Sequence, residues 1–259
     1  MEKIAIIIPA YNEEKRIAKT LEEYGKFFMN LKKTGKIDSE ILVVINNTND
    51  NTEEIVKKYQ KKYKIISYLN FKQGGKGFAI TEGFKKVLKN EKIKLIGFVD
   101  ADMATLPSAY YELVKNIGAY DGIIASRYIP GAKVNPRQSM KRVLVSRVFN
   151  FLIRCLFLMN YRDTQCGAKI FKRKTLAQII EHLGITQWAY DIDLLYQIKR
   201  KNLKLREFPT IWSDKEYSKI NIKKAGTNMV LGVIRLRILY SPIKSFIKLY
   251  DNFVDGILK

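Results

Sequence analysis

Short apolar runs that alternate with amphipathic stretches constrain the fold of this chain more than any other feature. Each run is bounded by polar residues or glycine, and the runs cover residues 4–9, 41–45, 65–70, 95–99 and 122–126. Helical periodicity occupies the segments between the first four, at residues 14–31, 52–63 and 77–88. Strands that alternate with helices form right-handed βαβ units. The pattern therefore predicts an α/β fold with a mostly parallel central sheet flanked by helices.

Polar residues gather where these predicted strands end. The segments are Pro-Ala-Tyr-Asn-Glu at 9–13, Asn-Asn-Thr-Asn-Asp at 46–50, the glycine-containing stretch 72–77 and Asp-Ala-Asp at 100–102. In open parallel sheets the carboxyl ends of the strands meet at one edge, and ligands bind there. We therefore expect these four segments to form one site.

Two carboxylates, Asp100 and Asp102, share the loop after the strand at 95–99. Carboxylate oxygens are the ligands that Mg²⁺ and Mn²⁺ prefer, and such ions often bridge substrate phosphates. An isolated Asp-x-Asp pair is more often a solvated turn or a helix cap. The pair indicates a metal site only together with the segments around it.

The opening motif and the Asp-x-Asp loop together resemble the inverting family-two glycosyltransferases, which have the GT-A fold. The resemblance implies that the opening motif lines the nucleoside pocket, through Pro9, Ala10, Tyr11 and Glu13. It also implies that Asp100 and Asp102 hold Mg²⁺ or Mn²⁺ on the diphosphate of a nucleotide-sugar donor.

Further motifs resemble the polyprenyl-phosphate sugar synthases of this family, at residues 74–77, 126–128, 162–167 and 188–191. The mannosyl enzymes tend to carry Gln at the position of Ala104. With Ala there, this chain resembles the glucosyl branch instead. The resemblance implies transfer of glucose, or next N-acetylglucosamine, from a UDP-sugar to dolichyl or polyprenyl phosphate, for protein glycosylation or surface glycans. A GDP-mannose-dependent enzyme is the alternative, and transfer to a hydroxyl acceptor fits the donor motifs equally well.

Asn46 marks a departure from the family pattern, because many members have two Asp after the second strand where this chain has Ile45-Asn46. The pairing edge of uracil presents one donor and one acceptor, which an amide matches with its own acceptor and donor. Guanine presents two donors there and suits a carboxylate. If Asn46 faces the base, UDP is favoured over GDP; otherwise Asn46 is a turn residue.

Two lysines are candidates for the donor diphosphate. Lys76 opens a predicted helix between two glycines, where backbone N–H groups and the helix dipole favour an anion. Lys219 belongs to a Ser-Lys segment that, by the resemblance, closes over the diphosphate. A solvated loop lysine is the alternative at both positions.

Arg127 and Arg142 match arginines that contact phosphates in the mannosyl relatives, and guanidinium groups bind phosphate oxygens bidentately. Arg142 also suits a basic helix face. Asp191 and Asp193 are two residues apart, and residues at this spacing in a helix lie on different faces. We therefore assign only Asp191 to the site. A phosphate acceptor is already an anionic nucleophile, so we expect one in-line step with inversion, without a tuned general base. Asp102, Arg127, Arg142 and Asp191 are therefore the expected catalytic residues.

The formal net charge of +22 over 259 residues predicts attraction to anions: phosphorylated substrates, anionic lipid or nucleic acid. A nucleic-acid-binding protein is the alternative of a different class, but the basic residues are dispersed and no nucleic-acid-binding motif occurs. We therefore expect no nucleic-acid partner.

We expect residues 1–220 to form the catalytic domain, with 1–130 as the nucleotide-sugar half and 131–220 as the acceptor half. Residues 221–259 form a basic amphipathic segment. No stretch reaches the ~18 uncharged apolar residues of a spanning helix, and no signal peptide is evident. We expect peripheral attachment to the cytoplasmic side of a membrane, through residues 140–159 and 221–259 lying in the anionic interface. Both stretches also suit helices packed on the sheet.

Overall fold

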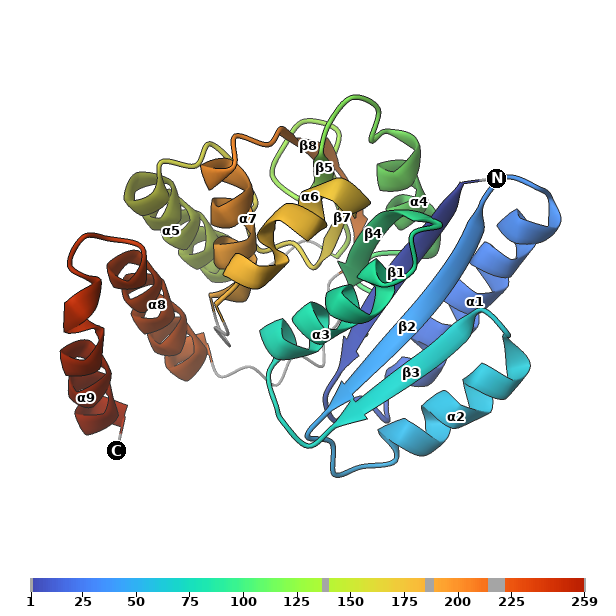
Figure 1. The fold of residues 1–259 in the computed structure, drawn as a ribbon, viewed down its shortest axis with the longest axis horizontal. Coiled ribbons are helices and arrows are strands. Elements are labelled where there is room, and N and C mark those ends of the chain that lie inside the picture. The colour runs from blue at the N-terminus through green and yellow to red at the C-terminus, as the bar shows by residue number, and fades with distance from the viewer. Residues whose placement is uncertain (1, 137–139, 185–188, 214–221, 259) are drawn as a thin grey trace.

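A mostly parallel sheet is the centre of the molecule (Figure 1). The computed structural model describes residues 2–136, 140–184, 189–213 and 222–258, without the side chains of 141–142, 222–225 and 255–258. Within these ranges seven strands form one sheet in the order β3-β2-β1-β4-β7-β5-β8. They are β1 (Lys3–Ala10), β2 (Asp38–Asn46), β3 (Ile66–Phe71), β4 (Ile93–Val99), β5 (Gly122–Ser126), β7 (Ala168–Lys172) and β8 (Leu205–Pro209).

β7 is the strand that breaks the parallel pattern. It pairs antiparallel with both β4 and β5, whereas β1 pairs parallel with β2 and β4, β2 with β3, and β5 with β8. Since β7 comes from the expected acceptor half and lies between two strands of the expected nucleotide half, the two halves share one sheet.

Helices cover both faces of the sheet. On one face lie α1 (Ile17–Lys33), α2 (Thr52–Lys62) and α4 (Pro107–Lys115); on the other lie α3 (Lys76–Leu88), α6 (Arg173–Ile179) and α7 (Tyr190–Arg200). The alternation in β1 explains why two cores form: Ile4, Ile6 and Ile8 pack toward α1, while Ala5 and Ile7 pack toward α3. Burial on both faces accounts for the continuous apolar runs in the sequence.

Shorter elements complete the fold. A two-stranded parallel sheet joins β6 (Lys133–Val134) to β9 (Ile211–Trp212), and Thr105 forms a bridge to Trp212. A 3₁₀ turn, Ile180–His182, follows α6. The small sheet therefore ties the segments after β5 and β8 to the loop after β4.

The C-terminal helices pack on a third core. α5 (Met140–Phe157) and α7 contact α8 (Ile222–Leu239), whose Val233 and Leu236 are fully buried. A 3₁₀ turn, Lys244–Phe246, leads to α9 (Ile247–Leu258), which packs on α8. Figure 1 shows α8 and α9 on the opposite side of the molecule from α1 and α2.

The expected fold is confirmed. The five predicted apolar runs are β1 to β5, the predicted helical segments are α1, α2 and α3, and the amphipathic stretch 140–159 contains α5. β7 was not expected, because the chain reverses direction there and its neighbours in the sheet are distant in sequence.

Candidate active site

The predicted strand-end segments lie at one edge of the sheet. β1, β2 and β4 run parallel, so the residues after them emerge together, and β5 brings Arg127 to the same edge. Pro9 and Ala10 are the last residues of β1 and are buried beside β2. Tyr11 is 53% exposed just beyond them. An exposed aromatic ring next to buried backbone is suited to contact a flat ligand such as a nucleobase.

The loop after β2 braces the opening motif. The backbone N–H of Glu13 donates to the hydroxyl of Thr52 at 2.8 Å, and that of Glu14 donates to Asp50 at 3.1 Å. Asp50 also accepts the N–H of Thr52, the first residue of α2. The polar residues of this loop thus position the motif around Tyr11, a function that its composition alone does not reveal.

The Asp-x-Asp loop is anchored from α1. Thr20 donates its hydroxyl to the carbonyl of Ala101 at 2.6 Å, and Tyr24 donates to the carbonyl of Thr105 at 2.9 Å. Both hydroxyl groups are buried, so these hydrogen bonds hold the loop firmly. Asp102 itself accepts the backbone N–H of Ala104 through Oδ1, at 2.9 Å.

Three carboxylates lie close together here: Asp100 and Asp102 belong to the loop, and Glu13 belongs to the opening motif. Burial raises the pKa of Asp100, and the neighbouring Asp102 raises it further, against the opposing effect of Lys76. Burial likewise raises the pKa of Glu13 although Arg16 pairs with it at 2.6 Å; Asp102 and Asp100 add to the increase. The neighbouring carboxylates thus add to the effect of burial on these pKa values. A cation bound among them would offset their mutual repulsion.

The donor set fits a divalent ion that shares its coordination with a ligand. Among the residues that the structure describes, no group of three or more His, Cys, Asp or Glu side chains is placed to hold a metal. If Asp100 and Asp102 held such an ion, two carboxylates would leave most of its coordination positions to phosphate and water, as is common for Mg²⁺. Gly167 lies directly behind Asp100, since a Cβ there would meet the carboxylate at 1.8 Å.

Lys76 reaches into this acidic cluster. Its ammonium lies 2.6 Å from Asp100 and 3.9 Å from Asp191, and it stands over the ring of Phe98. Although burial opposes the charge, the two carboxylates raise the pKa of Lys76. Lys76 was expected near a phosphate; in the structure it pairs with the predicted metal ligand Asp100.

Lys169 is a site residue that the sequence analysis missed. Its side chain is fully buried in β7, and its ammonium donates to Asp191 at 2.5 Å and to the carbonyl of Cys166 at 2.7 Å. Burial favours the neutral carboxyl of Asp191, but Lys169 and then Lys76 outweigh it and lower its pKa. Asp191 is therefore held ionised at the start of α7. The sequence did contain one indication of this residue, namely a lysine within the apolar run 168–171.

Asn46, which the sequence suggested as a residue that could face a nucleobase, is hydrogen-bonded to the backbone on both sides. Asn46 is 2% exposed; its Nδ2 donates to the carbonyl of Ala10 and its Oδ1 accepts the N–H of Gly75, each at 3.0 Å. The amide thus joins the end of β1 to the start of α3. This engagement favours a positioning function for Asn46.

Arg127 is engaged by a carboxylate of the protein. Its Nε and Nη2 donate to the two oxygens of Asp163 at 2.8 and 2.9 Å, and its backbone N–H donates to the same carboxylate. The side chains are 12% and 2% exposed, and the guanidinium stacks on Tyr128 and Trp212. Burial opposes the charge of Arg127, but Asp163 outweighs it and raises the pKa of Arg127. Much of its hydrogen-bonding capacity is used within the protein.

The two remaining predicted residues are not placed. Arg142 belongs to α5, but its side chain lies outside the described part of the chain, and Lys219 lies outside it altogether.

Asp193 lies away from the other carboxylates of the site, as the helical spacing predicted. It is fully buried, and it accepts the N–H of Gly184 at 2.7 Å and the hydroxyl of Tyr240 at 2.8 Å. It therefore links α7 to the end of α8.

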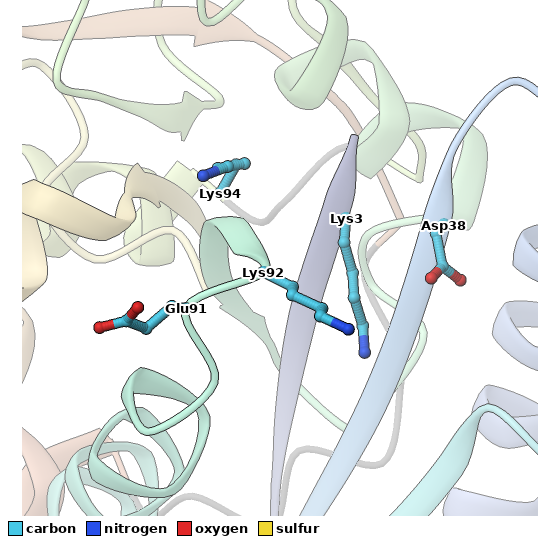
Figure 2. A pocket seen from close by; sticks show the side chains of 5 residues that line it. All are labelled: Lys3, Asp38, Glu91, Lys92 and Lys94. Carbon is cyan, nitrogen blue, oxygen red and sulfur yellow. The ribbon is translucent and has the colours of Figure 1, made fainter. Parts of the chain in front are cut away.

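A surface hollow at the other end of the sheet does not belong to this site. Figure 2 shows its lining side chains, Lys3, Asp38, Glu91, Lys92 and Lys94. They lie at or near the amino ends of β1, β2 and β4. Ligands of open parallel sheets bind at the carboxyl ends, so we place no chemistry in this hollow.

Comparison with known proteins identifies the family. The model of glycosyl transferase family 2 matches residues 5–180, which contain the opening motif, the Asp-x-Asp loop and Lys169. The chain belongs to glycosyl transferase family 2. Asp191, Lys219 and the C-terminal helices of this family 2 glycosyltransferase lie beyond the range that the family model matches.

Relatives of this glycosyltransferase share most of its length. It is 28% identical over 249 residues to a dolichyl-phosphate beta-glucosyltransferase of Dictyostelium discoideum, across 92% of this chain and 74% of the relative. It is 30% identical to the human protein of that name, across 85% and 70%. Glucosyl-3-phosphoglycerate synthase of Mycobacterium tuberculosis, solved with Mn²⁺, UDP and glucosyl-3-phosphoglycerate, superimposes with a TM-score of 0.66 at 17% identity, across 92% of this chain and 79% of that one. This likeness confirms the expected GT-A fold.

Proposed function

We propose that this family 2 glycosyltransferase transfers glucose from UDP-glucose to dolichyl or another polyprenyl phosphate, with inversion, and uses Mg²⁺ or Mn²⁺. The observation that carries the proposal is the acidic loop at the end of β4, set beside the opening motif in a chain whose relatives are named dolichyl-phosphate beta-glucosyltransferases. UDP, UDP-glucose and divalent metals in the complexes of the structural neighbours support the same donor and metal.

The donor side is assigned to the segments after β1 and β4. Asp100 and Asp102 would hold the divalent ion, which neutralises charge on the leaving diphosphate when bound. The nucleoside would lie against the opening motif, with Tyr11 exposed beside it. The proposed donor residues are Pro9, Ala10, Tyr11, Glu13, Lys76, Asp100 and Lys219. Asn46 acts as a positioning residue that connects β1 to α3.

The acceptor side needs positioning more than proton transfer. A phosphate monoester carries negative charge near neutral pH, so its oxygen can attack without a base. Asp191 is held ionised between Lys169 and Lys76, which suits an electrostatic function better than proton exchange near neutral pH. We assign Arg127 and Arg142 to the acceptor phosphate. Arg127 would use the N–H groups that Asp163 leaves available.

Attachment to an anionic membrane surface is proposed for the C-terminal side of the molecule. α5 exposes large apolar side chains with helical spacing, at Met140, Leu144, Val148 and Phe151. The segment around α9 exposes Ile243, Phe246, Leu249 and Phe253, with Lys244 and Lys248 interspersed. Apolar side chains mixed with lysine suit the interface of anionic lipid. None of the helices in the described ranges is long and apolar enough to cross a membrane.

One basic residue of α8 is already paired within the protein. Arg235 donates to both oxygens of Asp251, at 2.7 and 2.9 Å, which holds α9 against α8. A test by charge reversal should therefore spare Arg235 and change Arg237, Lys244 and Lys248 to Glu. We expect binding to vesicles rich in anionic lipid to fall in this variant. The matched control reverses Lys57, Lys58 and Lys61 on α2; equal loss in both variants would indicate a general charge effect.

The proposed reaction is tested by transfer into lipid. The purified protein is incubated with Mn²⁺ or Mg²⁺, labelled UDP- and GDP-sugars and a short polyprenyl phosphate, and the organic phase is extracted. We expect label from UDP-glucose in the lipid fraction, loss of transfer in Asp102→Ala, and an inverted anomer. Transfer only from GDP-mannose would establish the mannosyl alternative. Absence of transfer from every donor would overturn the proposal.

A further inference from the structure

The ion pair between Lys76 and Asp100 bears directly on how the proposed metal site fills. The ammonium lies 2.6 Å from Oδ1 of Asp100, and both side chains are 36% exposed. On its other side the carboxylate packs against Gly167, where a Cβ would lie 1.8 Å from Oδ2. The carboxylate is thus enclosed by backbone behind and by an ammonium in front.

Among the described residues, two ammonium groups face the carboxylates of this edge, and the two side chains differ in how freely they can move. Lys169 is fully buried and held by Asp191 and the carbonyl of Cys166. Lys76 is less enclosed: its backbone lies at the start of α3, and its side chain is 36% exposed, whereas that of Lys169 is fully buried. Lys76 is therefore the cation that can move.

Asp191 provides a second position for that movement. It lies 3.9 Å from the ammonium of Lys76 and is held in place by Lys169. If the ammonium leaves Asp100, it can turn to this carboxylate without losing an ionic partner. Asp100 then becomes available to another cation.

We propose that Lys76 is an exchangeable counter-ion of the metal site, which occupies Asp100 until a divalent ion arrives with the donor. The inference rests on the proposed assignment of Asp100 and Asp102 as metal ligands. An ammonium and a divalent ion repel each other at the same carboxylate, so Lys76 weakens binding of the free metal. The donor diphosphate reverses this effect, because it offers the displaced ammonium an anionic partner. Metal and nucleotide then bind cooperatively.

The test measures Mn²⁺ binding, with and without UDP, by the electron paramagnetic resonance signal of free Mn²⁺. Lys76→Met removes the charge and keeps much of the length; Lys76→Gln is a second variant of the same change. Lys86→Met, at an exposed lysine of the same helix, is the matched control. Without UDP we expect both Lys76 variants to bind Mn²⁺ at least about tenfold more tightly than the wild type, because the ion no longer has to displace an ammonium from Asp100. Even in water the attraction of two unit charges at 2.6 Å corresponds to about this factor.

The inference further requires that UDP enhances Mn²⁺ binding less in the Lys76 variants than in the wild type. It is overturned if both Lys76 variants bind Mn²⁺ within twofold of the wild type and of Lys86→Met. Failure of every protein to bind Mn²⁺, with or without UDP, overturns both the inference and the proposed metal ligands. The lipid-transfer assay on the wild type judges the proposed reaction separately.

Discussion

Removal of the Arg127 guanidinium should destabilise the protein whether or not it contacts substrate. Arg127→Met leaves Asp163, which is 2% exposed, without its partner for two side-chain hydrogen bonds. Truncating one member of a buried ion pair costs about 3–5 kcal/mol, chiefly because a charge remains buried without compensation. That is a large part of the roughly 5–15 kcal/mol by which a typical domain is stable.

The double variant Arg127→Met/Asp163→Asn separates structure from catalysis. The change from Asp163 to an asparagine removes the buried charge, and the new amide oxygen can still accept the backbone N–H that now goes to the carboxylate. We expect the double variant to recover about 2 kcal/mol or more of the stability that the single variant loses, measured by urea denaturation. The single variant Asp163→Asn completes the cycle, and the four unfolding free energies together give the coupling between the two side chains.

Transfer activity of the folded double variant then decides the function of Arg127. If the guanidinium contacts the acceptor phosphate, the double variant stays inactive despite its restored stability. If Arg127 acts only by holding Asp163, activity returns with stability. A single variant Arg127→Met that unfolds within about 1 kcal/mol of the wild type would refute the structural reasoning, since no buried charge would then have been left unpaired.

Three further substitutions give expected outcomes. Burial raises the pKa of Asp193 to about 6, from an ordinary value of 3.8, so its stabilising effect is complete below about pH 4 and is lost as the pH rises through 6. The difference in unfolding free energy between wild type and Asp193→Asn should therefore change by roughly 3 kcal/mol between about pH 4 and pH 7; a constant difference would contradict this. Gly167→Ala should displace the carboxylate of Asp100 and weaken Mn²⁺ binding in the presence of UDP, and unchanged binding would show that the carboxylate can shift without consequence. Asn46→Ala should cost about 1–3 kcal/mol of stability and raise the KM for the donor without changing the preference for UDP over GDP, whereas altered preference would show that the amide reads the base.

The sheet was predictable where strands are buried on both faces. Such strands appear as continuous apolar runs, and β1, β2 and β4 are of this kind. β7 is equally buried, but Lys169 and Lys172 interrupt its apolar pattern, and its place between β4 and β5 depends on pairing with residues far away in the chain. Local periodicity contains no record of such pairing.

The site was predictable in its residue types and less so in its partners. Position at the end of a strand drew attention to Asp100, Lys76 and Arg127, and the family resemblance supplied the functions expected of them. Their partners come from other elements of the chain. Lys76 pairs with Asp100 and approaches Asp191, and Arg127 pairs with Asp163. An isolated cation in a sequence suggests a phosphate contact, whereas the fold can satisfy the same cation with a carboxylate.

The net positive charge of the chain and the cations of the candidate site have different effects on anionic ligands. The chain has a net charge of +22, yet four cations described at this edge lie against carboxylates: Arg16 on Glu13, Lys76 on Asp100, Lys169 on Asp191 and Arg127 on Asp163. The surplus charge elsewhere can draw anionic substrates and anionic lipid toward the protein. At the edge itself, a diphosphate and a phosphate acceptor meet cations that already have partners. In the proposed reaction these described cations would contribute by exchange within their pairs, alongside a divalent ion and the proposed phosphate ligands Arg142 and Lys219. Among the described pairs, Lys76 is the cation placed to exchange.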